Sequence, residues 1–282
     1  MPLKYERNDE LTFDNFHNRD WYQVFLYGEQ ADIGGGTITK DEIDIIREHP
    51  ELERIAIMGL HQDTFDYFIH TYGGQFKAIY FWKNKLVSDL SALSTLENVE
   101  VLGYFLNQRA EKLWDMKNNK KLRMLNLDDF SRLKDLNGIE TAPALEGLQF
   151  GNKVWARTTI QHIPDLKNSS IKMINHNAEV SYEDTYRMLQ IPTLECLDFR
   201  TNLYPTDFLA WICANYPKLE GYCLKPYIVF PDHTGFICGK RKPSFDLTED
   251  KGRIMVEKAV KRFEQMKEKY AGLSFEDMMN QL

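Results

Sequence analysis

The sequence of 282 residues has no apolar run approaching the roughly 18 residues that a membrane helix needs. Its first residues, MPLKYERNDELTFD, lack an apolar core and a small-residue cleavage site, so we expect no signal peptide there. Cysteine is also scarce, and no two cysteines form a C-x-x-C pair; the four are Cys196, Cys213, Cys223 and Cys238. This usage argues against a metal cage or a disulfide framework and predicts reduced thiols in the cytoplasm.

Catalytic motifs are missing as well. The chain has neither G-x-S-x-G nor a recognisable Ser-His-Asp or Cys-His signature. Glycines 34–36, followed by Thr37, match no phosphate-binding loop and are expected to form a turn. The seven histidines form no H-E-x-x-H pair, so we expect no metal and no cofactor. A non-enzyme is the first hypothesis; an enzyme or enzyme subunit with a site in the end segments or in residues 151–170 is the alternative of another class.

The net charge of -7 disfavours non-specific binding to nucleic acid or to an acidic membrane surface. One short stretch, Lys240, Arg241 and Lys242, runs against this balance. Three basic residues in a turn can contact phosphate, but in an acidic chain such a turn is usually solvated. We therefore expect no nucleic acid and no membrane partner.

What the sequence does contain is a repeated apolar pattern: an apolar residue, two spacers, an apolar residue, one spacer and an apolar residue. Eight runs carry it, beginning at Leu52, Phe76, Leu96, Leu122, Leu145, Ile171, Leu194 and Leu219. The steps between these residues average about 24, within the range of leucine-rich repeats. Each run predicts a short strand, and a turn or a helix is expected to follow it.

This pattern resembles that of leucine-rich-repeat proteins over residues 38–230. The resemblance implies an α/β solenoid, a curved horseshoe with parallel strands on its concave face and helical or irregular segments on its convex face. Asn84 and Asn202 match the asparagine that usually follows the strand in this family. Because a repeat array has apolar ends, we expect caps at residues 1–37 and 231–282.

Helix signals support these boundaries. Thr39 and Glu42 have the spacing of a capping box, and Pro50 ends the segment before the first strand. Similar helices are expected at 182–189 and 206–213, and an amphipathic helix after Thr248 in the second cap. Residues 21–27 are rich in aromatic and β-branched side chains and predict a strand in the first cap.

Because side chains alternate along a strand, the residues between the apolar positions should point to the concave face. They begin apolar and aromatic and become polar along the chain, a composition that suits a protein-binding surface. The candidate contact residues are Arg54, Met58, Tyr80, Trp82, Glu100, Asn126, Asp128, Gln149, Asn175, Asn177, Asp198, Arg200 and Lys225. The same alternation points Leu102 outward. Tyr80 and Trp82 have a second interpretation, as side chains packed beneath the first cap.

The hypothesis from sequence is a cytoplasmic, non-enzymatic module that binds a protein on its concave face. A dedicated inhibitor, such as an immunity protein that neutralises a toxin, is the alternative among binding proteins. The identity of the partner is not encoded in any motif.

Overall fold

The computed structural model describes residues 4–6, 21–24, 37–152, 154, 158–240 and 242–282. The chain forms two compact units, residues 1–193 (unit 1) and 194–282 (unit 2). The predicted divisions at residues 37 and 230 concern repeats and caps and stay predictions. Most of the first expected cap, and the glycines at 34–36, lie outside the described residues.

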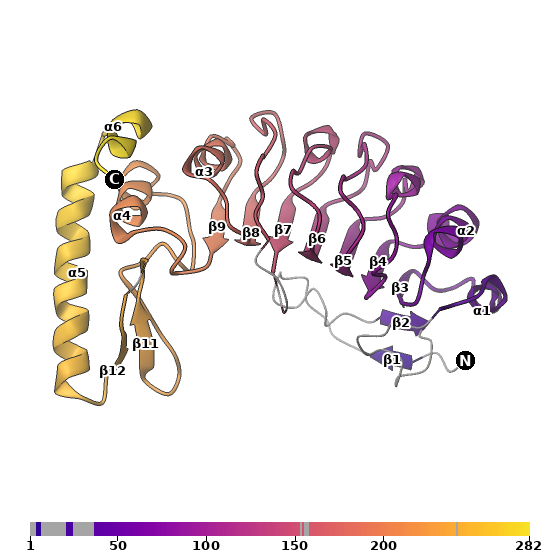
Figure 1. Ribbon diagram of the computed structural model, residues 1–282, viewed down its shortest axis with the longest axis horizontal. Coiled ribbons are helices and arrows are strands. Elements are labelled where there is room, and N and C mark those ends of the chain that lie inside the picture. Colours follow the sequence, from indigo (N-terminus) through magenta and orange to yellow (C-terminus); the bar gives the residue numbers. More distant parts are fainter. Residues whose placement is uncertain (1–3, 7–20, 25–36, 153, 155–157, 241) are drawn as a thin grey trace. The chain divides into compact units, whose positions relative to one another are not determined.

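Unit 1 is built on a sheet whose strands follow one another in chain order (Figure 1). The strands are β1 (Lys4–Glu6), β2 (Trp21–Val24), β3 (Arg54–Ile57), β4 (Ala78–Trp82), β5 (Val101–Asn107), β6 (Met124–Phe130), β7 (Gly147–Gly151) and β8 (Met173–Asn177). β1 pairs antiparallel with β2, and every later pair from β2 to β8 is parallel. The described part of unit 1 is therefore an α/β structure with a seven-strand parallel sheet that does not close into a barrel.

Short helices and loops connect these strands and lie on one side of the sheet (Figure 1). They are α1 (Lys40–Ile43), α2 (Gln62–Tyr72), α3 (Tyr182–Leu189) and short 3₁₀ helices at Asp44–Glu48, Gly73–Gln75, Ser91–Thr95 and Ile139–Thr141. The capping box that opens α1 is confirmed, since the Glu42 amide donates to Thr39 Oγ1 and Glu42 accepts from the Thr39 amide. The helix predicted at 182–189 is also confirmed.

The core of unit 1 lies between the sheet and these connections. Phe81, Tyr104 and Phe130 occupy successive strands, with ring centroids 5.1 and 5.2 Å apart. Phe65 of α2 packs 5.3 Å from Phe81. Each such fully buried ring contributes about 1.5–3 kcal/mol relative to exposure. The strands are short, so it is the stacking of neighbours that buries the apolar residues of each one.

The third apolar run is the place where the predicted register is wrong. In the sheet Leu102 pairs with Ile79 and is 1% exposed, so it points into the core and not outward. The run begins at Val99 instead of Leu96, and its core residues are Val99, Leu102 and Tyr104. A shift of three residues moves every side chain to the opposite face, because the period of a strand is two.

The corrected register reveals a buried asparagine in two successive repeats. Asn84 donates to Ile57 O and accepts from the Leu60 amide, at 2.9 and 2.8 Å. Asn107, one repeat later, donates to Val87 O at 2.9 Å and accepts from the Ala110 amide at 2.7 Å. Both side chains are fully buried. They satisfy backbone groups of turns that no strand partner reaches.

Unit 2 contains β9 (Cys196–Phe199), α4 (Thr206–Asn215), a three-stranded antiparallel sheet of β10 (Tyr227–Val229), β11 (Thr234–Ile237) and β12 (Ser244–Asp246), then α5 (Asp250–Tyr270) and α6 (Phe275–Met279). The predicted helix after Thr248 is confirmed as α5, with Val256, Phe263 and Tyr270 on its buried face. The eighth predicted strand is wrong. After one bridge at Glu220, residues 222–225 form turns and bends, so Lys225 is not on a strand.

Two further properties bear on earlier expectations. All four cysteines are free, and Cys223 and Cys238 are buried. Among the described helices, none combines the length and the apolar character needed to span a bilayer.

Candidate binding face

The outer face of the unit 1 sheet is the face opposite the core and the helical connections. The strand register arranges its side chains in rows that cross β3 to β8. The first row is Arg54, Ala78, Val101, Met124, Gly147 and Met173; the middle row is Ala56, Tyr80, Gly103, Asn126, Gln149 and Asn175; the last row is Trp82, Phe105, Asp128, Gly151 and Asn177. The face is apolar on β3–β5 and polar on β6–β8, apart from Arg54, Met124, Met173 and the glycines.

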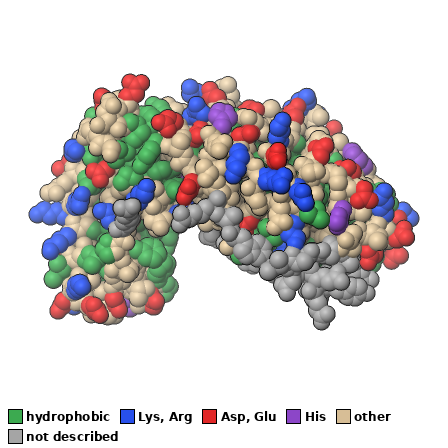
Figure 2. Space-filling view, viewed as in Figure 1, with side chains coloured by type: hydrophobic (Ala, Val, Ile, Leu, Met, Phe, Trp, Pro, Cys, Tyr) green, Lys and Arg blue, Asp and Glu red, His purple; other side chains and the backbone are tan. Residues whose placement is uncertain are grey.

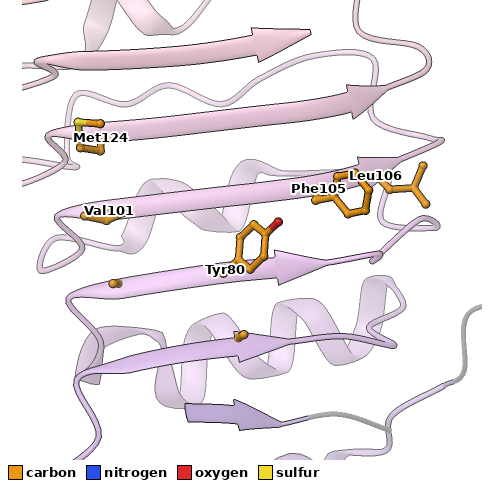
Figure 3. Close-up of a cluster of buried hydrophobic side chains, with 7 residues drawn as sticks. Tyr80, Val101, Phe105, Leu106 and Met124 are labelled. Atoms are coloured by element: carbon orange, nitrogen blue, oxygen red, sulfur yellow. The ribbon is translucent and has the colours of Figure 1, made fainter. Parts of the chain in front are cut away.

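The apolar half is a second hydrophobic cluster. Figure 3 shows Tyr80, Val101, Phe105 and Met124 on one face of the sheet, with a helix behind it. Tyr80 is 5% exposed and Phe105 3% exposed. Trp82 packs against this cluster half-buried, its ring centroid 4.7 Å from that of Phe105. Of the three aromatic side chains Tyr80, Trp82 and Phe105, Trp82 is therefore the one that is accessible to a partner.

Tyr80 connects the two halves. Its ring leans from β4 toward β5, where Gly103 is the register neighbour of Tyr80 and has no side chain to obstruct it (Figure 3). Burial raises the pKa of Tyr80 well above its usual value, and the charges of Asp128 and Asp129 raise it further. The phenol therefore stays protonated beside the polar half.

The strand ends share a left-handed residue. Lys83, Leu106 and Asp129 have φ angles of 55, 63 and 56°, and Gly59 occupies the same place after β3 with a φ of 80°. A non-glycine residue in this conformation costs roughly 1–2 kcal/mol. The conformation interrupts the alternation of side chains, so Leu106 joins the outer cluster and Asn84 and Asn107 turn inward.

The polar half contains an amide without hydrogen bonds. Asn126 is 1% exposed, and neither its Nδ2 nor its Oδ1 has a hydrogen-bond partner among the described residues. Its register neighbours are Gly103 on β5 and Gln149 on β7. Leaving a buried polar group unsatisfied costs about 1–3 kcal/mol. A site that retains such a group has unused capacity to bind a polar ligand.

Asp128 and Asn177 extend this polar half. Asp128 is 3% exposed and accepts from Gln149 Nε2 at 3.3 and 3.4 Å, the long end of the hydrogen-bond range. Asn177 donates to Asn152 O at 2.5 Å, while its Oδ1 is buried without a partner in the described structure. Gln149, half-buried, is held only weakly beside Asp128.

A row of charged side chains borders the face at the strand starts: Glu53, Lys77, Glu100, Arg123, Glu146 and Lys172. Lys77 Nζ lies 2.6 Å from Glu53, and Arg123 Nη2 lies 2.6 Å from Glu146. The hydrogen bond from Arg123 lowers the pKa of the Glu146 carboxyl. Figure 2 shows basic and acidic side chains side by side over unit 1. Charges of alternating sign pair along the sheet, which stabilises the register of neighbouring strands.

The structure gathers many of the sequence-predicted contact residues on the outer face, and it corrects two, Glu100 and the Lys225 described above. Arg54, Tyr80, Trp82, Asn126, Asp128, Gln149, Asn175 and Asn177 all lie there. Met58 follows β3 and is 3% exposed. Glu100 does not belong to the rows of the face, because the register error in the third run had moved it there; it lies in the charged row.

Asp198, Arg200 and Lys225 belong to unit 2. Asp198 Oδ1 accepts from the backbone amides of Tyr222 and Cys223, which fixes the turn that follows Glu220. Arg200 directly follows β9. Lys225 Nζ lies 5.8 Å from the centre of the Tyr222 ring.

Sequence reasoning missed Phe105 and Leu106 on the face and Asn107 beneath it. The sequence contains a signal for this register, because a third run that begins at Val99 makes the spacing of the runs more even. It also places Asn107 in register with Asn84.

Within the described ranges, no three His, Cys, Asp or Glu side chains gather as a metal ion would require. No protein-family model, curated protein or solved structure matches the chain significantly.

Proposed function

We propose that this chain is a leucine-rich-repeat protein that binds a protein partner, without catalysis, on the outer face of unit 1, the concave face of the solenoid. The corrected runs of unit 1 begin at Leu52, Phe76, Val99, Leu122, Leu145 and Ile171, about 24 residues apart. The seven-strand parallel sheet and the asparagines that follow β4 and β5 support this assignment. Four free cysteines support a reducing compartment such as the cytoplasm.

The observation that carries the binding proposal is the Asn126 amide, which is buried two residues from Asp128 on β6 and has no hydrogen-bond partner among the described residues. A partner that inserts a Lys or Arg side chain gives donors to Asp128 and to Asn126 Oδ1. Displacing Gln149 from Asp128 costs little, since its hydrogen bonds are 3.3 and 3.4 Å long. Trp82, half-buried at the other end of the last row, adds the aromatic contact that binding surfaces favour.

Affinity capture with four baits tests the proposal. The baits are the wild type, Asn126→Leu, Asp128→Asn and Lys167→Ala, the last a change of an exposed residue outside the outer face. A protein bound by the wild type and by Lys167→Ala should bind at least tenfold more weakly to the other two, which corresponds to about 1.4 kcal/mol.

Photo-crosslinking distinguishes direct contact from an indirect effect. A photo-activatable residue at position 175, on the outer face, should crosslink the captured protein, whereas the same residue at position 167 should not. Equal capture by all four baits, or crosslinking from position 167 alone, would contradict binding on this face.

A further inference from the structure

Unit 2 contains a hollow of about 650 Å³ that Gly239 and Lys242 help to line. The turn after β9, the turn at Tyr222, strand β11 and the start of β12 contribute to its wall. Its polar and aromatic lining includes Arg200, Thr201, Tyr222, Phe236, Lys242 and Ser244. The volume falls in the range of sites that hold small molecules, roughly 300–1,000 Å³.

The charge of this hollow is uncompensated. Among the residues that the structure describes, neither Arg200 nor Lys242 forms an ion pair, and no Asp or Glu lines the hollow. Arg200 Nε is buried and has no hydrogen-bond partner within the described chain. Asp198, the nearest acid along β9, already accepts two backbone amides of the adjacent turn. Two unpaired cations in one hollow of a chain with a net charge of -7 favour an anionic ligand.

Backbone contacts fix the segment that precedes Lys242 beside the turn that follows Arg200. The Gly239 amide donates to Thr201 O at 2.7 Å, and the Lys240 amide donates to Tyr204 O at 2.8 Å. Gly239 has a φ of 124°, and a Cβ there would lie 2.2 Å from Thr206 Oγ1, so only glycine permits this approach. Gly239 and Lys240 are thereby fixed against the turn that follows Arg200, which limits the backbone freedom lost when a ligand binds.

We propose that this hollow binds a phosphate monoester that carries an aromatic group. The planar guanidinium of Arg200 can bind two phosphate oxygens, and Lys242 adds a second positive charge. The hydroxyls of Thr201 and Ser244 are further donors on the same wall. The rings of Tyr222 and Phe236 offer faces for an aromatic group. A nucleoside monophosphate and a phosphorylated tyrosine side chain share this chemistry.

Calorimetric titration of the full chain separates these sources. The probes are AMP, phosphotyrosine, inorganic phosphate and adenosine, and the phosphate esters should bind more tightly than phosphate alone or adenosine. A preference for AMP identifies a nucleotide site, and a preference for phosphotyrosine identifies a side-chain site. Equal affinity for inorganic phosphate would overturn the aromatic part of the proposal, and no binding of any probe at millimolar concentration would overturn all of it.

Variants locate the binding. Arg200→Gln and Lys242→Gln should each weaken the tighter ester at least tenfold, while Lys258→Gln on α5, which removes the same charge from an exposed position, should leave it unchanged. A thermal unfolding curve for each variant establishes that it is folded, and Lys242→Gln serves if Arg200→Gln is not. Binding that is insensitive to both substitutions, or equally sensitive to Lys258→Gln, would place the ligand elsewhere.

Discussion

Two buried asparagines of the unit 1 sheet should respond oppositely to the same substitution. Asn107 is fully buried and Asn126 is 1% exposed, and leucine has nearly the same shape as asparagine without its polar atoms. Asn126 has no hydrogen-bond partner in the described residues, whereas Asn107 bonds to Val87 O and the Ala110 amide. Replacing each asparagine by leucine therefore measures the contribution of its hydrogen bonds to stability while the side-chain volume stays nearly constant.

The magnitudes follow from counting the groups left without partners. Asn126→Leu removes an unsatisfied buried amide and should raise the free energy of unfolding by about 1–3 kcal/mol. Asn107→Leu removes the partner of three backbone groups, Val87 O and the Arg109 and Ala110 amides. Two of these groups are left buried, since Val87 and Ala110 are 0% exposed. At about 1–3 kcal/mol for each buried group, the free energy of unfolding of Asn107→Leu should fall by about 2–6 kcal/mol.

Urea unfolding of the wild type and both variants measures these changes, and fluorescence and far-UV circular dichroism should be recorded together because the chain has two compact units. An ordered water on Asn126 would reduce the gain toward zero without reversing its sign. A loss of more than about 1 kcal/mol in Asn126→Leu would refute the argument, because it would show that the fold itself satisfies this amide.

Three further outcomes are expected. Gly151→Ala should lose at least about 1–3 kcal/mol in urea unfolding, because Gly151 has a φ of 121° and a Cβ there would lie 2.6 Å from the carbonyl carbon of Asn177. The hydrogen bond from Tyr67 lowers the pKa of the Asp44 carboxyl in the folded state. The stabilisation from this bond is therefore present above the unfolded pKa of 3.8 and is lost as pH falls through the folded pKa of Asp44. The stability difference between wild type and Tyr67→Phe should shrink below about pH 4, and a difference independent of pH would contradict this. Burial raises the pKa of the Cys238 thiol to about 12, so at pH 8 roughly one molecule in ten thousand carries the thiolate. Alkylation of Cys238, measured by peptide mass spectrometry, should therefore be slow until urea unfolds the chain.

The sheet of unit 1 is the part of the fold that local patterns predict best. The apolar runs beginning at Leu52, Phe76, Leu122, Leu145 and Ile171 each place their strand and its core face correctly. The capping box at Thr39 is equally local, because its two hydrogen bonds join residues three apart. Such signals survive folding because tertiary contacts reinforce them.

The errors arise where a local pattern has two solutions. Residues 96–104 read LENVEVLGY, and both Leu96 and Val99 can begin an apolar run. Leu96 is buried as well, at the end of the preceding 3₁₀ helix, so its apolar character is genuine but belongs to another element. The eighth run fails differently, since Asp198 accepts the Tyr222 and Cys223 amides and fixes a turn where the pattern predicts a strand. That contact spans 24 residues and has no local signal.

The sequence predicts where the side chains of the polar half lie, but not which of them have hydrogen-bond partners. Alternation places Asn126 on the outer face, but it says nothing about whether the amide has partners. Asn107 follows a left-handed residue, Leu106, and its side chain points into the core, where it bonds to backbone groups of the turn. Asn126 lies in the middle of its strand, where the neighbouring backbone groups already pair with β5 and β7. A strand interior offers a side-chain amide no backbone to satisfy, so its partner must come from a neighbouring side chain or from outside the fold. Gly103 on one side supplies none, and Gln149 on the other donates to Asp128 instead. The unsatisfied amide is thus a consequence of its position in the sheet, which is why we expect a ligand, and not the fold, to satisfy it.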